Sequence, residues 1–132
     1  MAATDPDRIH PRELAYLGDA VFELHTRLRL LGVAMSQHKR HRAAVERVRA
    51  AAQARVLRAL DAVLTEPERD IVRRARNVKG AIPRSADQET YRQATAFEAL
   101  IGYRYLAGPP ERLEELLALA DRTLEEGTQD AP

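Results

Sequence analysis

Residues 14–23 read LAYLGDAVFE, a stretch in which apolar side chains recur every three or four positions around one carboxylate. The same spacing continues beyond it and gives an apolar stripe made of Leu14, Leu17, Val21, Leu24, Leu28 and Leu31. Such spacing places side chains on one face of an α-helix. Pro11 suits the first turn of this helix, and Gly32 suits its end. The stretch therefore predicts a long amphipathic helix whose apolar face is either core or subunit interface.

Residues 95–102 read TAFEALIG, and they also set one carboxylate beside small residues within an apolar helix pattern. Asp19 lies off the apolar stripe of its own helix. Glycine inside a helix costs about 1 kcal/mol relative to alanine, so Gly18 and Gly102 need a reason. A close crossing of the two helices at these glycines would bring Asp19 and Glu98 within reach of one ion.

The chemistry of two such carboxylates suits phosphodiester hydrolysis. Hard cations such as Mg²⁺ and Mn²⁺ prefer carboxylate oxygens, and they can activate a water molecule and neutralise charge on a phosphoryl oxygen. Acidic residues are also common on solvated helix faces, so spacing alone leaves both interpretations open. Tyr16, beside the first acid, is interpreted as a packing residue with a satisfied hydroxyl.

The rest of the chain predicts an all-α fold, because alternating β-branched runs and hairpin turns are missing. A second helix is expected from His38 to Val63, with Ser36 as its cap. Thr65 followed by Glu68 is a capping-box start for a short helix toward Arg76. Two more helices are expected, from a Ser85 cap to Leu106 and, after a Gly108-Pro109-Pro110 break, from Glu111 to Glu126.

A length of 132 residues with 45% hydrophobic residues fits one compact domain. We expect an N-terminal extension over residues 1–10, the folded domain over 11–126 and a flexible tail over 127–132. The absence of cysteine excludes disulfides, a thiolate nucleophile and a Cys-rich zinc site, and it suits the cytoplasm. No apolar run approaches membrane-spanning length, so no membrane association is expected.

Charge is unevenly distributed although the formal net charge is only +1. Residues 38–58 and 69–84 together hold 13 of the 21 Lys and Arg residues, each segment with a single acid. Basic segments of this kind suit contact with nucleic-acid phosphates. A solvated helix face, or pairing with the acidic last helix, is the competing interpretation.

The quoted stretches resemble a known family. LAYLGDAVFE (14–23) resembles the signature of ribonuclease III, and AFEALIGY (96–103) resembles its second acidic motif. The run RRARNVK (73–79) and residues 87–95 are similar to Mini-ribonuclease III, a short branch that has the nuclease domain and lacks the double-stranded RNA-binding domain. The resemblance covers roughly residues 11–124 and follows the same motif order.

This resemblance implies a ribonuclease III-like helical endonuclease domain that forms a homodimer and cleaves double-stranded RNA. Asp19 and Glu98 would be its catalytic and metal-binding residues, with Mg²⁺ as the cofactor, Mn²⁺ as a substitute and no other cofactor. With this resemblance, the predicted RNA-binding residues are Arg73, Arg74, Arg76, Asn77 and Lys79, together with His38 and Lys39. Hydrolysis would leave 5′-phosphate and 3′-hydroxyl ends. The task implied by the short branch is maturation of 23S ribosomal RNA precursor, stimulated by a ribosomal protein bound to that RNA.

The sequence also departs from the longer ribonuclease III enzymes, which have further acids where Ala15 and Thr95 stand here. Fewer protein ligands would then hold the metal, and water and RNA phosphate would complete its coordination. A non-catalytic RNA-binding or ribosome-assembly protein on the same fold is the rival hypothesis. A purely structural helical dimerisation module is a third.

Overall fold

The computed structural model describes residues 5–78 and 87–129, and the regular structure within these ranges is helical, with no strand. The elements are η1 (Pro6–Arg8), α1 (Pro11–Leu31), α2 (Gln37–Val48), α3 (Ala50–Leu60), η2 (Asp61–Val63), α4 (Glu66–Arg76), α5 (Gln88–Ala107) and α6 (Pro110–Gln129). The all-α prediction is confirmed. None of the helices in these two ranges is long and apolar enough to cross a membrane.

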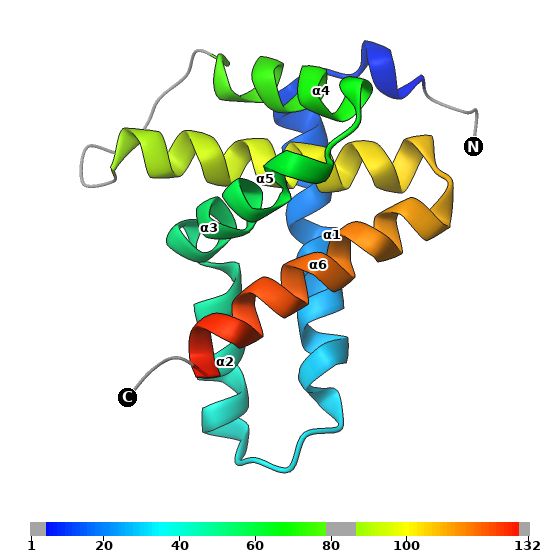
Figure 1. Ribbon diagram of the computed structural model, residues 1–132. Helices are drawn as coiled ribbons and strands as arrows, with labels where there is room; N and C mark the ends of the chain where they lie inside the picture. The colour runs from blue at the N-terminus through cyan, green and yellow to red at the C-terminus, as the bar shows by residue number, and fades with distance from the viewer. Residues whose placement is uncertain (1–4, 79–86, 130–132) are drawn as a thin grey trace.

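Helix α5 is the centre of the fold. It crosses α1 and also packs against α3, α4 and α6 (Figure 1). Phe22 of α1 meets Phe97 of α5 edge to face, with ring centroids 5.0 Å apart. Both phenylalanines are fully buried, in one cluster with Leu100 and Leu116. This packing fixes the α1–α5 crossing that holds the candidate site.

The single helix predicted over residues 38–63 is wrong, because the chain breaks it at Arg49. Arg49 has an extended backbone (ψ 157°), ends α2 and precedes α3. The sequence has no proline or glycine there, so the cause is tertiary packing. The guanidinium of Arg47 is held by Asp121 of α6 at 2.5 Å, while Val56 on α3 is buried in the core against α5. The two helices follow these different partners, and η2 ends the segment.

The other helix ends follow their sequence signals closely. Thr65 and Glu68 form the predicted capping box of α4. Helix α5 is capped by the side chain of Asp87 rather than by Ser85, which lies outside the described residues. Gly108 ends α5 with a φ of 61°, a conformation that favours glycine. Helix α6 continues to Gln129, into the segment expected to be a tail.

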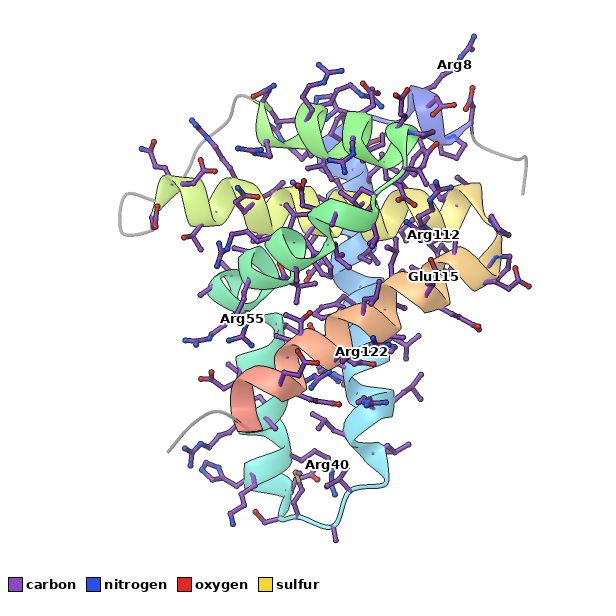
Figure 2. The ribbon with its side chains drawn as sticks, in the orientation of Figure 1. Arg8, Arg40, Arg55, Arg112, Glu115 and Arg122 are labelled. Atoms are coloured by element: carbon purple, nitrogen blue, oxygen red, sulfur yellow. The ribbon has the colours of Figure 1, made fainter. Side chains whose placement is uncertain are left out.

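The C-terminal half of α1 and α2 extend side by side away from α5 as a helical hairpin (Figure 1). Arg40 closes its far end, where its guanidinium donates to the carbonyl oxygens of Leu30 and Val33 (Figure 2). Asp121 of α6 is buried between His25 and Arg47, and it clamps the base of the hairpin. Two of the basic side chains in residues 38–58 are therefore structural.

A second buried acid joins α4 to the helices around it. The Glu68 carboxylate is fully buried and accepts hydrogen bonds from Arg104 at 2.6 Å and Arg112 at 2.7 and 2.9 Å. Burial alone would raise the pKa of Glu68, but the hydrogen bonds from Arg112, the Thr65 backbone and Arg104 outweigh it and lower the pKa to about 2. Glu68 is thus an ionised structural group that links α4, α5 and α6.

Candidate active site at the crossing of two helices

The two helix-interior glycines lie where α1 and α5 cross. A Cβ atom on Gly18 would stand 1.7 Å from the carbonyl oxygen of Glu98. A Cβ atom on Gly102 would stand 2.0 Å from the carbonyl oxygen of Leu14. Both distances are far inside van der Waals contact with backbone atoms, so neither position has room for a side chain. The expectation that these glycines permit a close crossing is confirmed.

The crossing brings together the side chains of Asp19 and Glu98, here called the acidic pair, closely enough for Asp19 to raise the pKa of Glu98. Asp19 is exposed, whereas Glu98 is partly buried. Burial raises the pKa of Glu98, and the hydrogen bond and negative charge of Asp19 raise it further, to about 8. The two acids therefore lie near each other, while the expectation that they are within reach of one ion, and their chemical roles, stay predictions.

The acidic pair fits a hard divalent cation. Burial and the neighbouring Asp19 raise the pKa of Glu98 to about 8, which favours a proton held by the pair near neutral pH. A cation between the two carboxylates would replace that proton and remove their repulsion. The donors are oxygen atoms, which Mg²⁺ and Mn²⁺ prefer over softer ligands.

The described residues add no further carboxylate to the acidic pair. Ala15 is buried and Thr95 is partly buried, one turn before each acid, and neither can ligate as a carboxylate. Across residues 5–78 and 87–129, no group of three or more His, Asp or Glu side chains could hold a metal ion. Glu23, one turn after Asp19, is tied to Arg27 at 2.9 Å. A bound cation would need water or substrate oxygens to complete its coordination.

Sequence reasoning missed Gln53 of α3, whose side-chain amide contacts the Glu98 carboxyl and lowers the pKa of that group against the larger effects of burial and Asp19. Gln53 is 2% exposed. The sequence position of Gln53 could have predicted its burial, because it lies one turn before the apolar Leu57 on the inward face of the helix. A polar residue at such a position is unusual enough to ask what it faces.

Tyr16 is 81% exposed, so its interpretation as a packing residue is wrong. Helical geometry places Tyr16 one turn before Asp19, on the outer surface of α1 rather than under α5. An exposed aromatic ring therefore borders the acidic pair.

The arginines at the end of α4 form ion pairs that a phosphate ligand could replace. Arg73, Arg74 and Arg76 lie in its last turn, which Asn77 ends. Arg73 and Arg74 share Asp70, and Arg76 pairs with Glu89 of α5 at 3.2 Å. Exposed pairs of this kind are weak, so phosphate oxygens can compete with the two acids. Within the described residues, no hydrogen bond or ion pair joins these arginines to the acidic pair, and Lys79 lies outside those residues.

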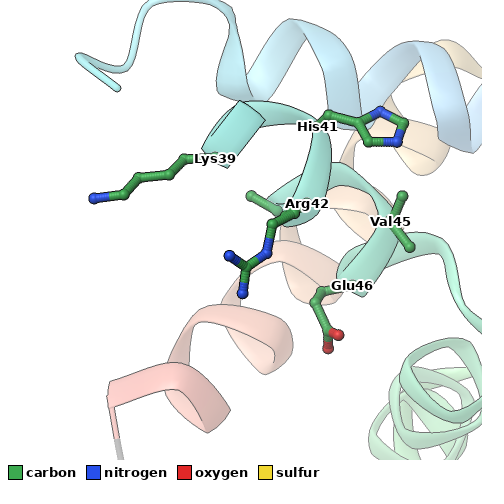
Figure 3. Close-up of a pocket in the computed structure, with 6 residues that line it drawn as sticks. Lys39, His41, Arg42, Val45 and Glu46 are labelled. Atoms are coloured by element: carbon green, nitrogen blue, oxygen red, sulfur yellow. The ribbon is translucent and has the colours of Figure 1, made fainter. Parts of the chain in front are cut away.

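Helix α2 carries the other two predicted RNA contacts. His38 and Lys39 are exposed in its first turn. Figure 3 shows Lys39 and Arg42 pointing away from His41, which lies on the side of Val45. The structure therefore places the two predicted RNA contacts of α2 on an open surface of the hairpin, apart from the acidic pair.

Comparison with known proteins gives one consistent result. The Ribonuclease III domain family matches residues 12–109. A protein named Mini-ribonuclease 3 from Symbiobacterium thermophilum is 47% identical over 96% of this chain and 99% of its own length. A Mini-ribonuclease 3 from a Synechococcus strain is 49% identical over 83% of this chain and 79% of its own. A crystal structure of a Fusobacterium nucleatum protein superposes with a TM-score of 0.82 at 30% identity, covering 88% of this chain and 97% of that one.

Proposed function

The chain belongs to the ribonuclease III domain family of endoribonucleases, in its Mini-ribonuclease III branch, and we propose that it hydrolyses double-stranded RNA in a metal-dependent reaction. The observation that carries this proposal is the acidic pair at the α1–α5 crossing. The close crossing requires glycine at two positions, Gly18 and Gly102. It brings together two acids that repel each other. Such an arrangement is useful to a protein that binds a cation there.

Asp19 and Glu98 would hold the cation, Mg²⁺ in our proposal, with Mn²⁺ as a substitute. When bound, such an ion activates water and neutralises charge on the phosphoryl oxygen that is attacked. Asp19 contributes the carboxylate exposed to incoming RNA, and Glu98 contributes the carboxylate fixed by the core. The proposed products are 5′-phosphate and 3′-hydroxyl ends.

The basic residues would position the duplex, because duplex RNA is recognised chiefly through phosphates, 2′-hydroxyls and shape. The proposed contacts are Arg73, Arg74, Arg76, Asn77 and Lys79 at the end of α4, and His38 and Lys39 on α2. The exposed side chains of Arg73 (66%) and Arg76 (45%) support this role for the α4 group.

We further propose that the protein acts as a homodimer through the outer face of α1. Leu24, Leu28 and Leu31 follow helical spacing there, and they are 60%, 60% and 69% exposed. The apolar stripe predicted from the sequence is thus covered by the core only at its N-terminal end. Burial of the remaining leucines against a second copy would remove apolar surface from water and place two acidic pairs in one particle.

The proposed substrate is 23S ribosomal RNA precursor, with a ribosomal protein bound to that RNA as a stimulating partner and the cytoplasm as the location. Its support is the similarity to the Mini-ribonuclease 3 proteins, over 99% of the length of one and 79% of the length of another. Ala15 and Thr95 stand in place of acids, so the protein offers few ligands for a metal. The alternative to be tested is therefore a non-catalytic RNA-binding or ribosome-assembly protein.

Incubation of the protein with a stem from 23S precursor RNA, in Mg²⁺ or in EDTA, tests the proposal. We expect Mg²⁺-dependent cleavage that Asp19→Asn abolishes while RNA binding and melting temperature are kept. Glu114→Gln, the same change on the exposed face of α6, is the matched control and should cleave normally. Binding without cleavage would support the non-catalytic alternative, and absence of salt-sensitive binding would support a structural dimerisation module.

A further inference from the structure

Gln53 is a buried polar side chain whose hydrogen-bonding needs the protein leaves unmet. It is 2% exposed, and its Nε2 has no hydrogen-bond partner of full geometry in the described part of the chain. A buried donor without a partner destabilises a folded protein, and a hydrophobic side chain of similar volume would avoid that loss. The position therefore needs a reason other than packing.

The surroundings of Gln53 show what its amide faces. Its neighbours Ala52, Val56 and Leu57 pack into the core against α5 and hold α3 in place. The amide then lies against the carboxyl of Glu98, which Asp19 approaches from α1. A carboxylate can only accept hydrogen bonds, so Nε2 is the atom that serves it. Glu98 thus has the carboxyl of Asp19 from α1 on one side and the neutral amide of Gln53 from α3 on another.

We propose that Gln53 is a positioning residue, which donates a hydrogen bond from Nε2 to the ionised Glu98 carboxylate and so orients its other oxygen toward the cation. This inference rests on the proposed function, because it assigns a neighbour to the same acidic pair. The unpartnered Nε2 is a buried donor that this carboxylate can use when a cation is bound to it. A neutral amide suits this task, since an arginine or lysine there would compete with the cation for the same oxygens.

The test replaces Gln53 by methionine, which has a similar length and volume but no donor. We expect Gln53→Met to weaken Mn²⁺ binding about 10-fold, measured on the RNA-free protein by the electron paramagnetic resonance signal of free Mn²⁺. The Mg²⁺ concentration for half-maximal cleavage should rise by the same factor, while cleavage at saturating Mg²⁺ approaches that of the wild type. The melting temperature should be unchanged or higher, because an unpartnered buried donor has been removed.

Arg55→Met, on the exposed face of the same helix, is the control and should bind Mn²⁺ like the wild type. Gln53→Leu provides a second apolar replacement if the methionine variant does not fold. Unchanged Mn²⁺ affinity in the variants would overturn the proposal for Gln53 alone, and so would a loss of affinity that merely follows a loss of stability. A wild-type protein that neither binds Mn²⁺ nor cleaves RNA would instead overturn the proposed function, and the role of Gln53 with it.

Discussion

Glu68 and Glu98 belong to neighbouring helices, α4 and α5, and their surroundings are opposite. The Glu68 carboxylate accepts hydrogen bonds from the guanidinium groups of Arg104 and Arg112, which outweigh the effect of burial and hold its pKa at about 2. Burial is also the largest cause of the shift at Glu98, but there the interacting carboxyl of Asp19 acts in the same direction, so the pKa rises to about 8.

This difference separates a structural acid from a functional one. Burial by itself does not identify a site, because Glu68 is more deeply buried than Glu98. What marks Glu98 is that no Lys, Arg or His side chain among the described residues pairs with it, so its charge can be balanced by a ligand.

The largest effect is expected on catalysis from Glu98→Gln. Loss of a metal-binding carboxylate should lower single-turnover cleavage of duplex RNA by about 1,000-fold, because the bound ion contributes several kcal/mol to transition-state stabilisation. Thermal stability should be kept, since the amide removes a repulsion and not an ion pair. Cleavage within a few-fold of the wild type would mean that Glu98 is not a ligand.

The next effect is on stability, from Glu68→Gln. This change leaves two buried guanidinium groups without their carboxylate and should lower the free energy of unfolding by about 3 kcal/mol. Urea denaturation measures the loss, with the exposed Glu66→Gln in the same turn as control. The folded fraction should still cleave RNA in the cold. Strong loss of cleavage by folded Glu68→Gln protein would abolish the distinction between the two glutamates.

A smaller effect is expected when the crossing itself is opened by Gly102→Ala. The new Cβ would meet the Leu14 carbonyl oxygen, so the helices must separate, at a stability cost of about 2 kcal/mol. Cleavage should fall as well, because Asp19 and Glu98 move apart. Gly32→Ala is the control, since a Cβ there meets nothing within 4 Å. Equal effects of the two substitutions on stability and cleavage would show that the close approach does not matter.

A separate effect is expected on the pH dependence of stability in EDTA. The folded pKa of Glu98, about 8, lies above the ordinary value of 4.5, so stability should fall as pH rises from about 4.5 to about 8. The folded pKa of Glu68, about 2, lies below the ordinary value, so its contribution is present above pH 4.5 and is lost toward pH 2. In thermal melts, Glu98→Gln should reduce the loss of stability between pH 4.5 and about 8. Glu68→Gln should reduce the loss of stability toward pH 2. These assignments would be contradicted if both variants reduced the loss of stability in the same pH range.

The sequence predicted most of what local rules control. Helix α1, the capping box at Thr65 and the close crossing at Gly18 and Gly102 follow from side-chain spacing, cap chemistry and the cost of helical glycine. The two acids of the site came from the same reasoning, because each lies beside one of those glycines. Their interpretation as a metal pair depended on the family resemblance and not on spacing.

Features that depend on distant partners were not predictable in this way. The break at Arg49 has no local helix breaker. It depends on the ion pair between Arg47 and Asp121, which lies 74 residues later in the sequence. The exposure of Tyr16 depends on which side of α1 the crossing helix covers. Gln53 reads as an ordinary polar residue until the fold places it against Glu98. Each of these outcomes is set by packing between helices, which propensity does not describe.

The most direct test of the acidic pair is the anomalous scattering of Mn²⁺ in crystals of the protein. We expect one strong peak per chain within coordination distance of a carboxylate oxygen of Asp19 and one of Glu98, and no peak at Glu68. Absence of Mn²⁺ at the α1–α5 crossing under saturating conditions, or its binding only elsewhere on the protein, would contradict the account.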